Sequence, residues 1–576
     1  MRGAPPSFYA LAGPLLLLLL LLLVSCRGFR PVPSSTRAGP GTVAGLALFR
    51  THLIRDPLSH PPLRTQPALL GSREGRGPDD SRRTASAKAD DGGPGIGEQI
   101  VSLAVPALAG LAIDPLMTLA DTAFVGRTAS GATALAGIGS SAAILTFSFY
   151  IFNFLCTATT PLIASRRAAG EEADALAVGG QSLSLSLALG STVSVGLILL
   201  SQPLLSVMGT GQTGPEANAY ATSFLVLRAL AAPAVLASSA STGILRGYLD
   251  TKTPLYILAG ANLVNFGLDV ILIAGADMGP TGAAIATTTA EWLAALAFLG
   301  GLGGRLPSAD GELGSNQEKS MVSGGGERRG AMTVVPTLSV PPWEDVKPLV
   351  VASSSVFLRT VVLQIALSGA AAMAARNTGV EASASVAAHQ IALQLWLLCS
   401  FVCDALAAAS QALVADALGR ENAEDAREIS STIFVFSLGL GGVLSGALAL
   451  GLATGFLLDF FTTDEATKTA LRELLGIIIF AQPLNSFVFA ADGVLQGASE
   501  FTYQAKSMAV SVFVAISSFA GLEYLAHCSE IDGQLSDTLV HVWEALIVLQ
   551  FMRALTSLVK LVQPEGQIDL LGKRTL

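Results

Sequence analysis

The chain has 576 residues, of which 51% are hydrophobic and only 13% are charged, and its formal net charge at pH 7 is −9. Soluble domains carry about 25% charged residues, so this composition excludes an ordinary soluble globular protein. The apolar residues occur in runs of about 20, the length of a helix that crosses a bilayer, and not in the short alternating segments of a membrane β-barrel.

The N-terminal region has the composition of a targeting leader. Residues 1–28 contain Arg2, the apolar run LAGPLLLLLLLLLV and then SCRG, which is typical of a secretory signal peptide. Residues 29–95 begin with an arginine-containing stretch that has no acidic residue before Asp56, which is typical of a transit peptide. This order resembles the bipartite leaders of algae with complex plastids, where a residue such as Phe29 follows the first cleavage site. The alternative is a secretory signal with a polar tail, which would lead to the plasma membrane or endomembranes.

Twelve apolar segments follow the leader, in two groups of six. The first six lie in an N-lobe predicted at 96–303, and the second six lie in a C-lobe predicted at 343–565, with a polar, Gly-rich loop at 304–342 between them and a tail at 566–576. The segments are centred on residues 100–125, 133–163, 175–200, 219–243, 254–275 and 280–303, and then on 347–374, 384–416, 428–458, 470–495, 503–526 and 536–562.

The two groups are related by an internal repeat. PAVLASSASTGILRGYLD (233–250) aligns without gaps to PLNSFVFAADGVLQGASE (483–500), and ALAGIGSSAAIL (134–145) lines up with SVAAHQIALQLW (385–396) at nearly the same offset. Six spans separate equivalent positions, so the repeats are parallel. The fold class that follows is an all-α polytopic membrane protein with twelve transmembrane helices in two parallel six-helix lobes.

Positively charged residues favour the side of the membrane that carries the 304–342 loop. By the positive-inside rule, this side, with both termini, faces the cytosol or stroma. Its loops carry Arg166, Arg167, Arg246, Lys252, Arg420, Arg427 and Lys506, whereas the opposite loops carry only Arg127, Arg376, Lys468 and Arg472.

Several motifs in this order resemble the multidrug and toxic compound extrusion (MATE) transporters. DPLMTLADTAFVGR (114–127) is similar to that family's first helix, GILRGYLDTKTP (243–254) to its signature loop, and NLVNFGLDVILI (262–273) to its fifth helix. In the second half, AAHQIALQLWLLCSFVCDALAAASQALVADALG (387–419) and QPLNSFVFAADGVLQGASEF (482–501) resemble the branch of bacterial DinF-like proteins and plant citrate or salicylate-related transporters. The resemblance extends over about residues 97–562.

The fifth span carries polar residues where lipid should exclude them. On an α-helix Asn262, Asn265 and Asp269 lie at about 0°, 300° and 340°, on one narrow face. The first span places Asp114 and Asp121 on one face in the same way, and the sixth span offers Thr287 in IATTTAEW. An intramembrane acid is costly and faces a partner or a wet cavity. These residues therefore mark a candidate site in the N-lobe.

Burial favours the neutral, protonated form of a carboxyl group, which can release its proton when its cavity opens to water. The resemblance implies the same role, and it maps a proton site onto Asp121, Asn265, Asp269 and Thr287; Asp114 belongs to the branch's DP element. Each of these residues could instead have a structural role in its own helix or in helix packing. Asp121 could cap a helix end, and Asp114 could form hydrogen bonds with backbone groups that Pro115 leaves unpaired. The polar face of the fifth span could form hydrogen bonds that hold neighbouring helices together.

The C-lobe departs from this pattern because its eleventh span has no Asn/Asp pair, so a sodium site there is not expected. Arg359 could form an ion pair with Asp404 or Asp492, or it could attract an anionic substrate. Gln390 and Gln394 could line a substrate cavity, and His389 is interpreted as a packing residue.

The leading hypothesis is a proton-coupled antiporter that exports small organic molecules, either organic anions or xenobiotic cations, by alternating access. The alternatives are a lipid-precursor flippase of the same superfamily and an intramembrane enzyme, although no HExxH or GxSxG motif supports the latter. No cofactor or metal is expected, and the proton is favoured over sodium as the coupling ion. The expected partners are the lipid bilayer and the substrate, with no nucleic acid, and the protein is expected to be a monomer.

Overall fold

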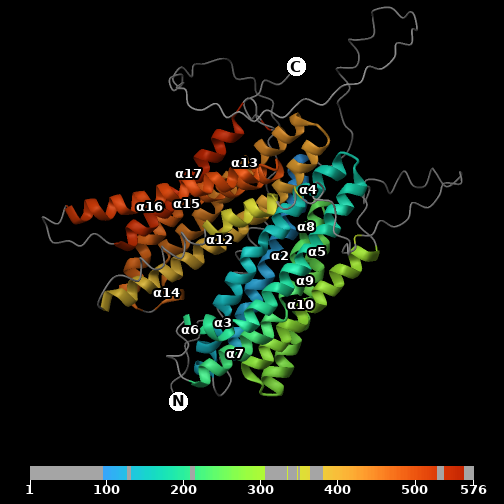
Figure 1. Cartoon of the computed structure of the whole chain (residues 1–576). Helices are drawn as coiled ribbons and strands as arrows, with labels where there is room; N and C mark the ends of the chain where they lie inside the picture. Colours follow the sequence, from blue (N-terminus) through green and yellow to red (C-terminus); the bar gives the residue numbers. More distant parts are fainter. Residues whose placement is uncertain are drawn as a thin grey trace, which may run out of the picture. The chain divides into compact units, whose positions relative to one another are not determined.

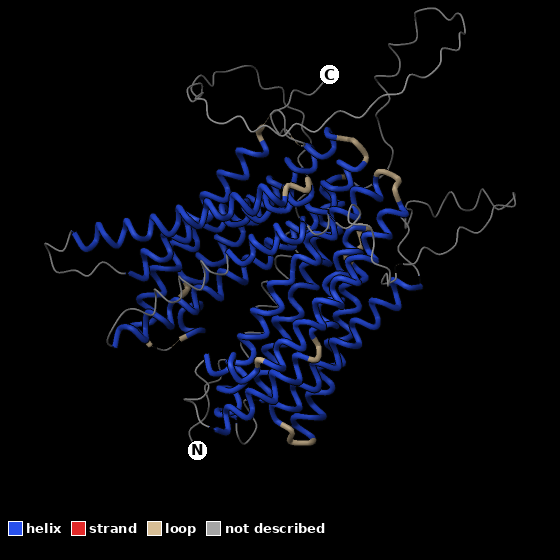
Figure 2. The backbone as a smooth tube through the Cα atoms, viewed as in Figure 1, coloured by secondary structure: helices blue, strands red, loops and turns tan. Residues whose placement is uncertain are grey.

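The computed structural model describes residues 95–125, 131–207, 215–304, 334, 347, 351–362, 380–462, 464–528, 538–563 and 568. The predicted signal and transit segments, nearly all of the 304–342 loop and most of the 566–576 tail lie outside these residues. Among the residues that are described, the regular structure is helical throughout (Figure 2).

The first half contains helices that match the six predicted spans. The second and fourth spans are each built from two consecutive helices, and the fifth ends in a π-helical turn. The elements are α2 (Ile96–Val125), α3 (Gly131–Tyr150), a 3₁₀ turn (Ile151–Asn153), α4 (Phe154–Ala168), α5 (Glu172–Leu199), α6 (Ser201–Val207), α7 (Pro215–Ala229), α8 (Ala232–Gly247), α9 (Lys252–Asp269), η3 (Val270–Gly275) and α10 (Gly279–Gly304).

The second half repeats this order. Its first predicted span, near 347–374, is described only over the short helix Val351–Val362. The remaining elements are α12 (Val380–Gly419), α13 (Ala423–Ala453), α14 (Phe456–Phe461), α15 (Glu465–Gly497), α16 (Phe501–Cys528) and α17 (Thr538–Leu561). In Figure 1, α13, α15, α16 and α17 lie together, and α5, α7, α9 and α10 form a second group, in agreement with their contacts.

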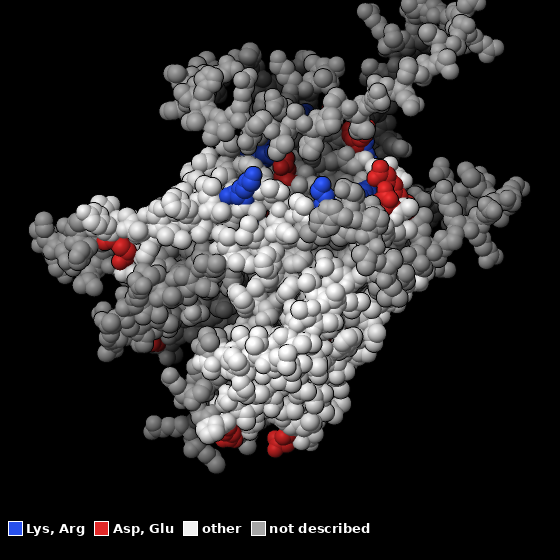
Figure 3. All heavy atoms as spheres, viewed as in Figure 1, with Lys and Arg blue, Asp and Glu red and all other residues white. Residues whose placement is uncertain are grey.

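The described residues include ten helices that are long and apolar enough to cross a membrane, or eleven if α7 and α8, which are bent by 46°, form one span. Large apolar side chains are exposed on these helices, such as Leu199 (74%), Phe480 (87%) and Phe513 (71%), as expected of surfaces in contact with lipid. Figure 3 shows the charged side chains of one face near the helix ends, with a wide uncharged band between them. The predicted fold class, a polytopic all-α membrane protein, is confirmed.

The internal repeat is visible in how helices approach one another. A Cβ atom on Gly190 would lie 2.5 Å from Cα of Pro233, and a Cβ atom on Gly441 would lie 2.5 Å from Cα of Pro483. These are equivalent positions in the two halves, and in each case only glycine allows the close approach of α5 to α8, or of α13 to α15. The repeat predicted from sequence is therefore also a repeat of helix packing.

The two halves also differ at the proline of this repeat. In the first half, the span is broken before Pro233, where α7 ends at Ala229 and α8 begins at Ala232. In the second half, α15 continues through Pro483 as one helix. The same residue at the same repeat position is thus accommodated by a bend in one half and within a continuous helix in the other.

Helices α2 and α4 connect the halves. Ile100 and Leu103 of α2 are buried in a cluster with residues of α12, α13 and α15. At the end of α4, Ser165 lies so close to Gly419 of α12 that a Cβ atom on that glycine would be 2.2 Å from the Ser165 carbonyl oxygen. Because α4 and α12 both end on the side of the 304–342 loop, which we call the linker side, the halves are in contact there.

Candidate functional site

Of the three polar residues predicted on one face of the fifth span, the two nearest its C-terminal end are buried. In α9, Asn265 is 1% exposed and Asp269 is 0% exposed. Asn262, one turn earlier, is only partly buried, and its Nδ2 donates to the carbonyl oxygen of Leu258 of the same helix at 2.9 Å. The buried polar group is therefore the amide and carboxylate pair of Asn265 and Asp269, with Asn262 directed to its own backbone.

Asp269 lies where the helix changes its geometry. The α-helix ends at this residue, and Val270–Gly275 continues as a π-helix. Such π-helical turns interrupt the regular hydrogen-bond ladder and are frequent at functional positions. The junction places a buried carboxylate next to a backbone that is easier to rearrange than a continuous α-helix.

The helices that carry the other predicted residues pack directly against α9. Both α2 and α10 contact it. Thr287 of α10 is partly buried, and its Oγ1 donates to the Ala283 carbonyl oxygen at 2.8 Å. Asp114 and Asp121 belong to α2, but their side chains lie outside the described part of the structure. The structure thus brings the three predicted helices together and leaves the role of the two α2 acids as a prediction.

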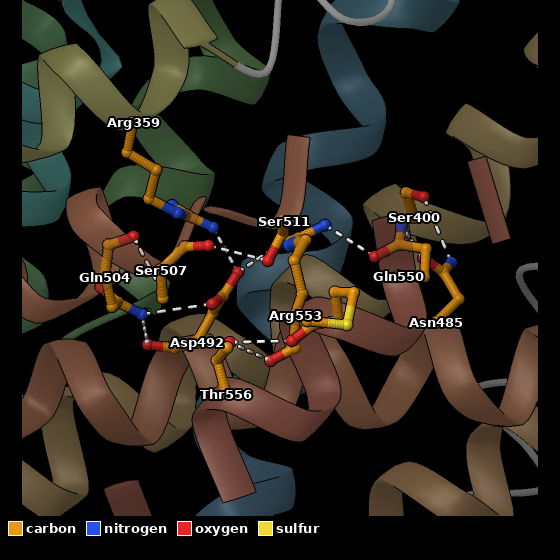
Figure 4. Close-up of polar contacts among 11 residues, drawn as sticks. Arg359, Ser400, Asn485, Asp492, Gln504, Ser507, Ser511, Gln550, Arg553 and Thr556 are labelled. Carbon is orange, nitrogen blue, oxygen red and sulfur yellow. Dashed lines mark hydrogen bonds and ion pairs between the residues drawn. The ribbon is translucent and has the colours of Figure 1, made fainter. Parts of the chain in front are cut away.

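A second polar cluster lies in the C-terminal half and is centred on Asp492 of α15 (Figure 4). Arg359 and Arg553, which come from different helices, both form ion pairs with Oδ2 of this carboxylate. Gln504 of α16 donates to Oδ1 at 3.2 Å and to the backbone carbonyl of the same residue at 3.0 Å. Of the two acids predicted as partners of Arg359, the structure selects Asp492.

A hydrogen-bonded chain extends from this cluster into the core of the half. Nη1 of Arg553 donates to Oε1 of Gln550 at 2.8 Å, and Nε2 of Gln550 donates to Oδ1 of Asn485 at 3.2 Å. Asn485 in turn donates to the Ser400 hydroxyl at 3.3 Å. Three side chains, one each from α17, α15 and α12, therefore form a hydrogen-bonded chain that ends on the Arg553 guanidinium.

Asp404 of α12 lies near the same cluster without joining it. It is attracted electrostatically by Arg359 and by Arg246, which belongs to α8 of the other half, and it is repelled by Asp492. Arg246 donates to Sγ of Cys156 at 3.6 Å. Charged side chains from both halves thus lie within electrostatic range of one another.

The remaining predicted residues of α12 have different environments. Gln390 and Gln394 are exposed on this helix. His389 is 1% exposed, and its ring lies 5.8 Å from the indole of Trp543, edge to face. This geometry agrees with the interpretation of His389 as a packing residue.

Sequence reasoning missed Arg553, the second guanidinium of the cluster. The signal was present, because Arg553 is a charge inside the apolar stretch LQFMRALTSLV of the last span, and intramembrane charges mark functional or paired positions. It also missed the buried ion pair between Arg167 and Asp416, at 2.6 Å, which joins the two halves on the linker side. In the sequence, Arg167 belongs to a charged loop and Asp416 to the end of a predicted span, so nothing there pairs the two.

The fold and these clusters define a class, a polytopic membrane transporter built from two repeated helical halves with polar groups buried inside them. The MatE family matches residues 106–271 and 353–520, which cover both halves. The chain therefore belongs to the multidrug and toxic compound extrusion (MATE) family of efflux transporters.

Two plant relatives share this match over most of the chain, and a bacterial relative shares it over a third. Protein DETOXIFICATION 45, chloroplastic, of Arabidopsis thaliana is 31% identical over 475 residues, which cover 76% of this chain and 78% of the relative. Protein DETOXIFICATION 44, chloroplastic, of the same plant is 32% identical over 451 residues, covering 74% and 77%. DNA damage-inducible protein F of Escherichia coli is 34% identical over 191 residues, or 33% of this chain and 40% of the relative. The resemblance to the DinF-like and plant branch is confirmed.

Solved structures show the same fold. A structure described as MATE in the bent conformation superposes with a TM-score of 0.65, at 21% sequence identity, and covers 81% of this chain and 93% of that chain. A MOP superfamily transporter from Pyrococcus furiosus superposes with a TM-score of 0.64 at 20% identity, covering 80% and 93%. At these identities the likeness shows the fold of the chain.

Proposed function

We propose that the protein is a proton-coupled antiporter that exports small organic molecules by alternating access of its two halves, as a monomer, with the proton site in the first half. The observation that carries this proposal is the complete burial of the Asp269 carboxyl group beside Asn265 in a membrane-spanning helix. Asp114, Asp121, Asn262 and Thr287 are the further residues assigned to this site.

The physical argument rests on the cost of a charge in hydrocarbon. A buried carboxylate costs several kcal/mol, about 3 on insertion scales, so such a group favours its protonated, neutral form when water is excluded. Opening of the half to water on one side removes this cost and releases the proton. The neighbouring amide of Asn265 can donate to the ionised form or accept from the protonated form, so both states keep a partner.

The test is substrate-driven proton flux in proteoliposomes that contain the full-length protein and a pH-sensitive dye. Ethidium and benzoate serve in turn as the cationic and anionic probes. Asp269→Asn is expected to abolish proton flux, and Asp121→Asn is expected to reduce it strongly. The matched control is Asp277→Asn, which changes an exposed acid just beyond the π-helical turn and is expected to retain full flux.

Undiminished proton flux in both Asp269→Asn and Asp121→Asn would overturn the assignment of the proton site. A flux that follows an imposed sodium gradient, and not a proton gradient, would overturn the proposed coupling ion. A protein that moves labelled lipid-linked precursors but neither probe would be the flippase instead.

We also propose that the protein resides in the envelope of a complex plastid. The support is the bipartite composition of residues 1–95, together with two Arabidopsis thaliana relatives that are described as chloroplastic. A fusion of residues 1–95 to a fluorescent protein is expected to reach the plastid. Secretion of the fusion would defeat this part of the proposal.

A further inference from the structure

The fourth span of the first half is broken inside the membrane. Helix α7 ends at Ala229, α8 begins at Ala232, and the two helices are bent by 46°. The N–H of Ala231 donates to the carbonyl oxygen of Arg228 at 3.1 Å, and not to that of Leu227, its partner in a regular α-helix. Carbonyl groups at the break therefore lose their helical partners in a region where lipid offers no replacement.

Helix α10 supplies replacement hydrogen bonds from one of its faces. The hydroxyl Oγ1 of Thr288 donates to the Leu227 carbonyl oxygen at 3.2 Å, and the indole Nε1 of Trp292 donates to the Leu230 carbonyl oxygen at 3.2 Å. Thr288 and Trp292 are four residues apart, so their side chains lie one above the other on the helix. In a continuous helix, both carbonyl oxygens would be bonded within the fourth span itself.

An ion pair joins the same two helices at the break. Arg228, in the last turn of α7, donates to both carboxylate oxygens of Glu291, with Nη2 at 2.8 Å from Oε1. The two side chains are 13% and 24% exposed, and Glu291 lies midway along α10. Two parallel hydrogen bonds between a guanidinium and a carboxylate fix orientation as well as distance. The end of α7 is thus held against α10 by a charge pair that is costly to separate unless water reaches it.

Pro233 does not explain the break on its own. Pro483, at the equivalent position of the second half, lies within the continuous helix α15. The residue of that half that is equivalent to Arg228 is Ile478, which carries no charge. The bent and the continuous forms of one repeated span are thus both present in this protein, and the bent form is the one that α10 holds.

Helix α10 also belongs to the proposed proton site. Thr287, which is assigned to that site, is the neighbour of Thr288 in the sequence, and α10 packs against both α7 and α9 (Figure 1). Helix α9 carries the buried Asp269. Because packed interiors transmit displacements, a shift of α10 on α9 also changes its packing on α7.

We propose that Thr288, Glu291 and Trp292 form a clasp that holds the fourth span bent, and that the clasp opens and closes in each transport cycle. The open form is a continuous helix, as in α15. The three are positioning residues, because they act on the fourth span and not on the substrate. The part of the clasp in the cycle rests on the proposed antiport, whereas the dependence of the bend on the clasp does not.

Distances between spin labels measure the bend in the full-length protein in nanodiscs. The labels replace Ala219 of α7 and Lys252, which follows α8, and both positions are exposed. With arms of about 16 and 24 Å on the two sides of the break, straightening the 46° bend lengthens this distance by about 3 Å. Glu291→Gln is expected to populate the longer distance, and so is the combined variant Thr288→Val/Trp292→Phe.

The combined variant keeps the test informative, because it changes no charge and leaves no arginine unpaired. The matched control is Thr289→Val, since Thr289 is the exposed neighbour of Thr288 and donates to its own helix at Ile285. This control is expected to keep the wild-type distance. The wild-type distance in the combined variant would overturn the clasp.

A reversible covalent bridge tests whether the clasp opens during transport. Arg228→Cys and Glu291→Cys are combined, the two thiols are joined by a bifunctional methanethiosulfonate reagent, and proton flux driven by ethidium or benzoate is measured in proteoliposomes. Bridging is expected to lower the flux by about tenfold or more, because the conformational step is blocked, and reduction is expected to restore it.

Unchanged flux in the fully bridged protein would overturn the role of the clasp in the cycle. Clasp-dependent distances in a protein that shows no flux at all would remove the proposed antiport and leave the clasp as the element that sets the bend. Proton flux together with distances that do not depend on the clasp would remove this inference and leave the antiport.

Discussion

Replacing Asp416 with asparagine is expected to shift the protein toward a state in which its two halves separate on the linker side. Asp416 lies near the end of α12 and forms an ion pair with Arg167 of α4 at 2.6 Å, and both side chains are only 7% exposed. A second ion pair, with Arg420 just beyond the end of this helix, involves a side chain that is 58% exposed. The first pair joins the halves and the second does not.

The magnitude follows from this difference in burial. An exposed pair within one helix contributes about 0–1 kcal/mol, whereas removal of one partner from a buried pair costs about 3–5 kcal/mol, because it leaves an uncompensated charge. This penalty applies only while the halves are closed, since Arg167 is hydrated when they separate. Allowing for partial rehydration, we expect a shift of about 2–3 kcal/mol, or roughly 30- to 150-fold, in favour of the open state.

Distances between spin labels measure this equilibrium directly. Ala173 and Ala423 are exposed, equivalent positions in the first turns of α5 and α13, and both can be replaced by labelled cysteine in a background where Cys26 and Cys528 are serine. In the full-length protein in nanodiscs, Asp416→Asn is expected to populate longer distances than the wild type.

Two variants make this experiment decisive. Glu424→Gln removes an exposed acid from the same side of the second half and is expected to leave the distances unchanged. Arg167→Gln is expected to shift the distances in the same direction as Asp416→Asn, and the double variant should shift them no more than either single variant, because it leaves neither buried charge without its partner. Unchanged distances in Asp416→Asn, or full additivity in the double variant, would refute the reasoning.

Two further predictions concern stability. Gly493→Ala is expected to lower the melting temperature or prevent folding, because its Cβ atom would lie 2.4 Å from the Ala407 carbonyl oxygen, whereas Gly446→Ala, at an open position of α13, is expected to keep or raise it. Tyr248→Phe is expected to cost about 1 kcal/mol at pH 8, measured by thermal unfolding, because the Tyr248 hydroxyl donates to Glu172 at 2.8 Å. Burial and this hydrogen bond raise the pKa of Tyr248 above its ordinary value, so its stabilising effect is present below about pH 10 and is lost as the pH rises further, and the difference between wild type and variant should shrink at high pH. A difference that grows with pH would contradict this sign.

The internal repeat was accessible from sequence because it depends on small residues at fixed offsets. Gly243 and Gly493 align in the two copies, and in the structure both are positions where a helix passes against another backbone, with Cys156 in one half and Ala407 in the other. A close approach of this kind requires glycine, which is visible in the sequence. The polar face of the fifth span could also be predicted from the sequence, because it depends only on hydrophobicity and helical period within one segment.

The ion pairs were not accessible in the same way. Arg359 and Asp492 are 133 residues apart, and Arg167 and Asp416 are 249 residues apart. Hydropathy places Arg359, Asp416 and Asp492 in predicted spans and Arg167 in a loop. It does not say which helices are neighbours or how each helix is rotated about its axis. From the sequence, Asp404 and Asp492 were equal candidates for the ion-pair partner of Arg359. The packing of the helices in the structure brings Asp492 into contact with it.

The sequence by itself determined that this is a membrane protein, that its helices form two repeated groups, which family it resembles and which polar residues lie in the first half. Each of these features depends on composition, helical period or residue spacing. Only the tertiary structure decided that two arginines share one carboxylate in the second half, and that a buried ion pair holds the halves together on the linker side. The physical reason is that a charge inside a membrane protein is governed by its partners, and its partners are set by which helix faces meet in space.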